Sequence, residues 1–176
     1  MHGDLRIRTD FFTRPPRISP ERLEQLWNES EGKHPPFTSK SLLAEMKKTN
    51  REKDYAVIGE LARRMESPRE ILLYSRSARD IIELAESFPE LILEIKVRRE
   101  LLTKLPCPIE QLEKELDAER RKLMHANEDR LSKYEALSRK WADKWPEVQK
   151  LTCGKPLAEA HEIILENAEG ALPYSP

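Results

Sequence analysis

Glycine is scarce in this chain of 176 residues, which contains five glycines beside thirteen prolines. All-β proteins need glycine in their tight turns, so its scarcity argues against that fold class. It also leaves no glycine-rich loop of the kind that surrounds a phosphate group. No stretch approaches the ~20 apolar residues that cross a bilayer, and no apolar run of a secretory signal follows Met1. We therefore expect a cytoplasmic protein with no membrane partner.

Cysteine is scarce as well, and charge of one sign does not dominate. Cys107 and Cys153 are the only two cysteines, which we expect to be free thiols in a reducing compartment. Zinc would need more ligands at closer spacing than the four scattered histidines offer, so no metal site is predicted. The 31 basic and 32 acidic residues leave a net charge of −1. Nucleic acid is therefore not expected as a partner.

Apolar residues recur at helical spacing through most of the chain, and serines precede several of these segments. Ser19 with Pro20 is expected to open the first helix, and Ser67 with Glu70 forms the pattern of a capping box before another. The apolar run at 91–95 is dense enough to predict burial on nearly all sides. The sequence therefore predicts a mostly α fold.

Composition shifts divide the expected fold into four parts. An N-terminal arm at 1–18 is expected to hold one β-strand, because apolar and charged residues alternate there. A compact multi-helix domain follows at 19–105. A long charged helix or helical hairpin is expected at 106–146, and a short terminal helix and tail at 147–176.

The expected long helix contains neither glycine nor proline from Ile109 to Trp145. Its nine acidic and nine basic residues predict a solvated helix with one narrow apolar stripe. The stripe either packs on the chain's own domain, with Asn127 capping the second helix of a hairpin, or pairs as a coiled coil with a protein partner or a second copy. Pro146 is expected to end the helix. The candidate residues for a partner-helix face are Leu112, Leu116, Leu123, Leu131, Tyr134, Trp141 and Trp145.

A basic stretch lies where the second expected helix gives way to the third. Such a turn collects cations and backbone N–H groups, which suits a phosphate group. The candidate phosphate-binding residues are Lys47, Lys48, Arg51 and Lys53. A simpler explanation is that lysines at the end of a helix complement its dipole.

The segment from Leu43 to Leu61, with its Lys-Lys-Thr-x-Arg-x-Lys-Asp-Tyr core, resembles the helical region after the catalytic sheet in minimal bacterial nucleotidyltransferase-like proteins. The stretch from Leu5 to Phe12 is similar to the last catalytic strand of that family. The resemblance covers about residues 5–65. It implies that Asp10 matches the family's third metal-binding carboxylate, and that its basic stretch corresponds to Lys47, Lys48, Arg51, Lys53 and Asp54.

The departure from the family concerns its catalytic half. The Gly-Ser turn and the paired Asp-x-Asp, which hold the triphosphate and two Mg²⁺ ions, should lie upstream of Asp10, where nine residues remain. One carboxylate cannot hold a two-metal site, so no catalytic site is complete. No cofactor is expected, and Mg²⁺ would be needed only if the catalytic half is supplied elsewhere.

We therefore expect a non-catalytic helical protein that acts through a protein partner, or as a homo-oligomer through the long helix. One alternative is a truncated or split nucleotidyltransferase-like enzyme, which a Gly-Ser…Asp-x-Asp coding stretch upstream of Met1 would support. A second alternative is a helical nucleic-acid-associated module, which the balanced charge disfavours.

Overall fold

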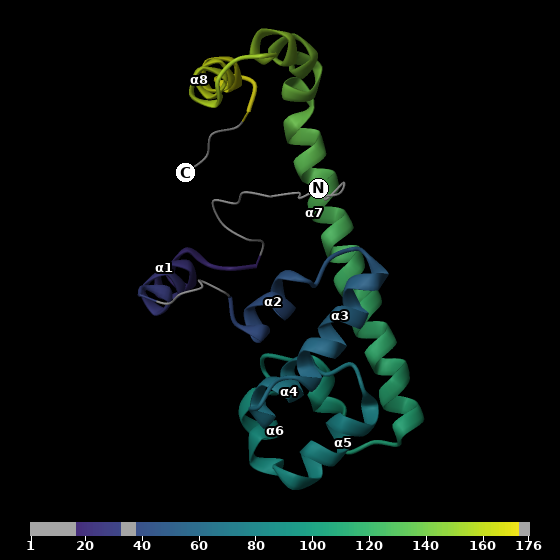
Figure 1. Ribbon diagram of the computed structural model, residues 1–176. Helices are drawn as coiled ribbons and strands as arrows, with labels where there is room; N and C mark the ends of the chain where they lie inside the picture. The colour runs from purple at the N-terminus through teal and green to yellow at the C-terminus, as the bar shows by residue number, and fades with distance from the viewer. Residues whose placement is uncertain (1–16, 33–37, 173–176) are drawn as a thin grey trace, which may run out of the picture. The chain divides into compact units, whose positions relative to one another are not determined.

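The computed structural model describes residues 17–32 and 38–172, and Figure 1 shows their arrangement. Within these ranges the chain is mostly helical and contains no β-strand, which confirms the fold class predicted from the sequence. The expected N-terminal strand and Asp10 lie outside the described residues. The elements in chain order are α1 (Pro20–Ser30), α2 (Lys40–Met46), α3 (Glu52–Arg63), α4 (Pro68–Tyr74), α5 (Ala78–Ser87), α6 (Pro89–Ile95), the 3₁₀ helix η1 (Glu100–Lys104), α7 (Ile109–Thr152) and α8 (Leu157–Ala168).

The helix starts follow the sequence signals closely. The Ser19 hydroxyl accepts a hydrogen bond from the Arg22 amide at 3.2 Å, which satisfies one of the first N–H groups of α1. Helix α4 begins at Pro68 as predicted, but the predicted capping box is wrong because the Ser67 side chain makes no cap bond. Pro68 itself has no N–H to satisfy and its ring presets the helical φ angle, so α4 can begin without that bond.

The described residues up to Met124 form a compact unit, which we call unit 1. Two clusters of buried side chains make its core. The first joins α4, α5, α6 and η1 to the start of α7, through Leu72, Ala78, Ile81, Ile95, Leu101, Leu102, Leu112 and Leu116. The second joins α2, α3 and α4, through Ala44, Tyr55, Ile58, Ala62, Met65 and Tyr74.

The apolar run at 91–95 is less buried than the sequence predicts. Ile95 is fully buried, whereas Leu93 is 68% exposed, so the prediction of burial on nearly all sides is wrong. Helix α6 has only seven residues and packs against α4, α5 and η1. A helix of two turns on the outside of a bundle can direct only one face inward.

Helix α7 is one continuous helix of 44 residues. The chain does not turn at Asn127, so the hairpin alternative is wrong, and the expectation that Pro146 ends the helix is also wrong because α7 continues to Thr152. Proline removes a single backbone hydrogen bond and crowds the preceding turn, which kinks a helix without always ending it. In Figure 1 the last turns of α7 bend away from the direction of its earlier part.

The described residues from His125 onward form a second compact unit, unit 2, which contains the rest of α7 and α8. The link between these helices contains Gly154, whose φ of 72° is accessible to glycine at little cost. Lys144 Nζ donates a hydrogen bond to the Asn167 carbonyl at 3.0 Å, which connects α7 to α8. Val148 and Ala168 are buried in this unit.

Candidate interaction surface

Helix α7 of unit 2 carries a row of large apolar side chains on one face. Residues three and four apart lie on the same side of a helix, so these side chains form a continuous strip. Its members are Leu131, Tyr134, Leu137, Trp141 and Trp145, which we call the α7 stripe. Tyr134 is 62% exposed and Leu137 56% exposed, while Leu131 and Trp145 are each 39% exposed. A surface helix of a self-contained protein normally turns such residues inward.

The two tryptophans form the C-terminal end of the α7 stripe. Their ring centroids lie 5.7 Å apart and the ring planes are inclined by 47°, a geometry in which aromatic pairs attract each other. Trp141 is half-buried, and Val148, one turn beyond Trp145, is fully buried. The pair therefore marks the place where the apolar strip passes from exposed to buried.

The structure divides the partner-face residues predicted from the sequence into two groups. Leu112 and Leu116 are buried in the core of unit 1, and Leu123 packs against its second cluster. The other four predicted residues, Leu131, Tyr134, Trp141 and Trp145, belong to the α7 stripe. Leu137 joins them. Only this second group lies at the surface, so only it is a candidate for contact with another molecule.

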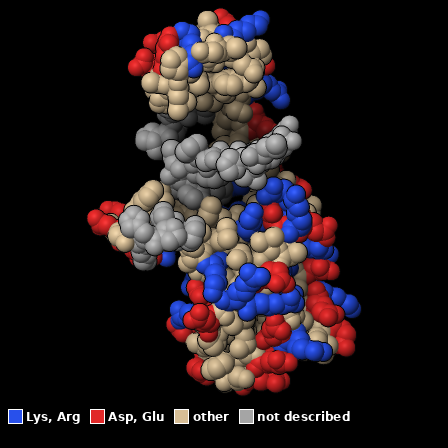
Figure 2. Space-filling model, viewed as in Figure 1, with Lys and Arg blue, Asp and Glu red and all other residues tan. Residues whose placement is uncertain are grey.

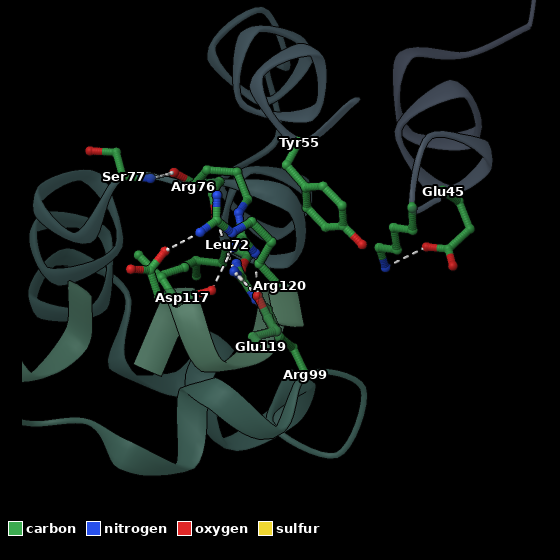
Figure 3. A network of polar contacts seen from close by, with 12 residues as sticks. Glu45, Tyr55, Leu72, Arg76, Ser77, Arg99, Asp117, Glu119 and Arg120 are labelled. Atoms are coloured by element: carbon green, nitrogen blue, oxygen red, sulfur yellow. Dashed lines mark hydrogen bonds and ion pairs between the residues drawn. The ribbon is translucent and has the colours of Figure 1, made fainter. Parts of the chain in front are cut away.

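A buried network of charges fixes the first part of α7 to the rest of unit 1 (Figure 3). Glu119 accepts hydrogen bonds from Arg99 at 2.9 and 2.8 Å and from Arg76 at 2.5 Å. Arg99 also donates to the carbonyls of Leu72 and Ser75, at 2.7 and 3.0 Å. The network thus joins α7 to the last turn of α4 and to the residues before α5 and η1.

The charges of this network stabilise one another. Burial by itself raises the pKa of Glu119, but the hydrogen bonds and positive charges of Arg99 and Arg76 outweigh it and hold that pKa below its ordinary value. Burial lowers the pKa of Arg76, which nonetheless stays a cation beside the carboxylate. We assign the network a structural role, because each carboxylate oxygen already has an arginine partner.

The basic turn between α2 and α3 is organised around one buried carboxylate. Asp54 accepts hydrogen bonds from Thr49 and Arg51, at 2.5 and 2.9 Å, and Lys47 Nζ lies 3.9 Å from its other oxygen. Burial by itself raises the pKa of Asp54. The hydrogen bonds and positive charges outweigh this effect, so the pKa lies below its ordinary value. Lys48 pairs with Glu45 at 2.6 Å.

Three of the four candidate phosphate-binding residues, Lys47, Lys48 and Arg51, are thus in ion pairs within the chain. The fourth, Lys53, lines a cavity of about 590 Å³ between α3 and α7, together with Arg76 and Arg120. The acidic residues Glu52, Glu113 and Asp117 line the same cavity. Arg120 pairs with two of them, Glu52 and Asp117. The cavity is therefore balanced in charge, and the phosphate-binding hypothesis stays a prediction.

Acidic and basic side chains are mixed over unit 1 on the face shown in Figure 2. In the described ranges no group of three or more His, Cys, Asp or Glu side chains is placed to hold a metal ion. Cys107 is half-buried and Cys153 exposed, and both are free thiols. Among the helices of the described residues, none is long and apolar enough to cross a membrane.

The chain matches no protein-family model, no curated protein and no solved structure. Among the described features, the exposed apolar side chains of the α7 stripe are the best candidate for contact with another molecule.

Proposed function

We propose that this chain is a cytoplasmic, non-catalytic interaction protein that binds a protein partner through the α7 stripe. The observation that carries the proposal is the exposure of Tyr134 and Leu137, at 62% and 56%, in the middle of a row of large apolar side chains. Covering large aromatic and aliphatic side chains gains about 25 cal/mol for each Å² removed from water. Tyrosine and tryptophan are also the residues that dominate binding energy at protein interfaces.

The test compares two variants that add the same two carboxylates to α7. The stripe variant is Tyr134→Glu with Leu137→Glu, and the control is Ser132→Glu with Ala136→Glu, which lie on the opposite face and are exposed. Tagged full chains are used for affinity capture, and each captured protein is purified and mixed again with the wild-type chain.

We expect a partner that binds the wild type and the control but binds the stripe variant about tenfold or more weakly. Circular dichroism should show the same helix content for all three chains. If every purified partner binds all three chains equally, the α7 stripe is not an interaction surface and the proposal fails.

A second candidate is a nucleotidyltransferase-like enzyme whose catalytic half comes from elsewhere. It is supported by the resemblance of the segment from Leu43 to Leu61, whose Lys53 lines the cavity between α3 and α7. Thermal unfolding with Mg²⁺ and ATP tests it, because a ligand that binds the folded state raises the melting temperature. A rise that disappears in Lys53→Ala would support this candidate, and an unchanged melting temperature would contradict nucleotide binding by this chain.

A further inference from the structure

We propose that the partner of the α7 stripe is an amphipathic helix of another protein with a row of acidic residues along one edge. This inference rests on the proposed function and specifies the chemistry of the partner. It is carried by the order of charges beside the stripe and by the length of the exposed strip.

The two edges of the α7 stripe carry opposite charges. With 100° between successive residues of an α-helix, Lys133, Lys140 and Lys144 follow one edge, while Arg130 lies within the stripe between Leu137 and Trp141. The acidic residues Asp129 and Glu147 lie about 20° outside Lys140. Glu128 and Glu135 follow the other edge. Lys133 and Lys140 are exposed and no ion pair is seen for either among the described residues, whereas Lys144 is bonded to Asn167. A partner helix that lies along the stripe meets Lys133 and Lys140, which are about two turns apart.

The exposed strip also limits the size of the partner. Asn127 and Val148, on the same face before and after the stripe, are both buried. The strip from Leu131 to Trp145 therefore spans about four helical turns, or roughly 21 Å. One short amphipathic helix matches that length, as in complexes where a helix lies in an apolar groove.

A second copy of this chain fits the charges less well. In an antiparallel pair of α7 helices, equivalent edges face each other, so basic edge meets basic edge. A parallel pair would bring opposite edges together, but its seam would continue to Leu112 and Leu116, which are already buried in the core of unit 1. The charge pattern therefore favours a different, acidic helix.

The test uses the full chain and two labelled synthetic peptides. Each peptide is an amphipathic helix of about five turns with leucine on its apolar face. One carries glutamate along an edge and the other carries lysine at the same positions. Fluorescence anisotropy gives the affinity of each peptide for the wild type, for Lys133→Glu with Lys140→Glu, and for the matched control Arg139→Glu with Lys150→Glu, which makes the same change in net charge on the opposite face.

We expect the acidic peptide to bind the wild type and the control about tenfold or more tightly than the basic peptide. The preference should reverse in the chain with Lys133→Glu and Lys140→Glu. Equal affinities, no binding, or the same reversal in the control would overturn the inference.

Sedimentation of the peptide-free chain tests the second copy. The inference predicts a monomer, and a dimer that disappears with Tyr134→Glu would overturn it. These outcomes are separate from the proposed function, which still stands if affinity capture finds a stripe-dependent partner that lacks an acidic edge.

Discussion

The two halves of α7 share one helix and one apolar face, but they differ in how much of that face is buried. Before Met124, leucines of this face are buried in the core of unit 1, and Glu119 is held by two arginines. After His125, the same kind of face shows Tyr134 and Leu137 to solvent. The comparison shows that helical periodicity identifies an apolar face but does not tell whether the chain itself or another molecule covers it.

The difference lies in what faces each half. The first half meets a buried network and the helices of unit 1, whose side chains supply both apolar contacts and ion pairs. In unit 2, Val148 marks a buried point near the end of α7, and the α7 stripe precedes it. The first half is therefore expected to govern the stability of the fold, and the second half the binding of a partner.

The largest expected effect follows from removing the carboxylate of Glu119. Glu119→Leu leaves the buried Arg99 and the neighbouring Arg76 without a counter-charge, which should lower the free energy of unfolding by about 3–5 kcal/mol. The matched change in the second half, Glu135→Leu, removes an exposed carboxylate and should change it by less than about 0.5 kcal/mol. Urea unfolding followed by circular dichroism measures both, and equal losses would remove the distinction between the halves.

A leucine on each half gives the next comparison. Leu112 is fully buried, so Leu112→Ala should lower the free energy of unfolding by about 2–5 kcal/mol through lost contacts and a new cavity. Leu137 is 56% exposed, so Leu137→Ala should have an effect below about 0.5 kcal/mol. Urea unfolding followed by circular dichroism measures the free energy of unfolding of both variants. A large loss for Leu137→Ala would mean that the chain's own residues cover the second half.

The smallest expected effect is a dependence of stability on pH. The pKa of Glu119 is lower in the folded state than in the unfolded state, so its stabilising contribution is present at neutral pH and is lost as pH falls through the folded-state pKa. Asp54 behaves in the same way. Unfolding at successive pH values below about 5 should show this loss, and Glu119→Gln should make the curve shallower. An unchanged curve would contradict the role of the network.

Much of the fold could be predicted from the sequence, because local signals determine it. The Ser19 cap and the inward face of α3, with Tyr55, Ile58 and Ala62, follow from helix periodicity and capping preferences. The continuation of α7 through Pro146 could not be predicted, because helix propensity alone does not say whether the kink is tolerated. The exposure of Leu93 could not be predicted either, because the apolar run at 91–95 does not show which faces of α6 have neighbours.

Less of the candidate site could be predicted from the sequence. The pairing of Arg99 with Glu119 joins residues 20 positions apart, and that of Arg76 with Glu119 joins residues 43 positions apart. The one local signal was Arg99 itself, an arginine between the core residues Ile95 and Leu101. The division of the apolar face of α7 also depends on long-range packing. The residues of the face were recognisable from the sequence, but their separate roles were not.

Thiol labelling of the two halves tests the central claim most directly. Cysteine is placed at Leu116 or at Leu137 in a chain with Cys107→Ser and Cys153→Ser, and its reaction with a thiol reagent is timed in the folded protein. We expect the thiol at 137 to react nearly as fast as in the unfolded chain, and to react more slowly when the acidic peptide is bound, while the thiol at 116 is protected. Equal rates at the two positions would contradict the account, and a rate at 137 that the peptide does not change would contradict the acidic partner alone.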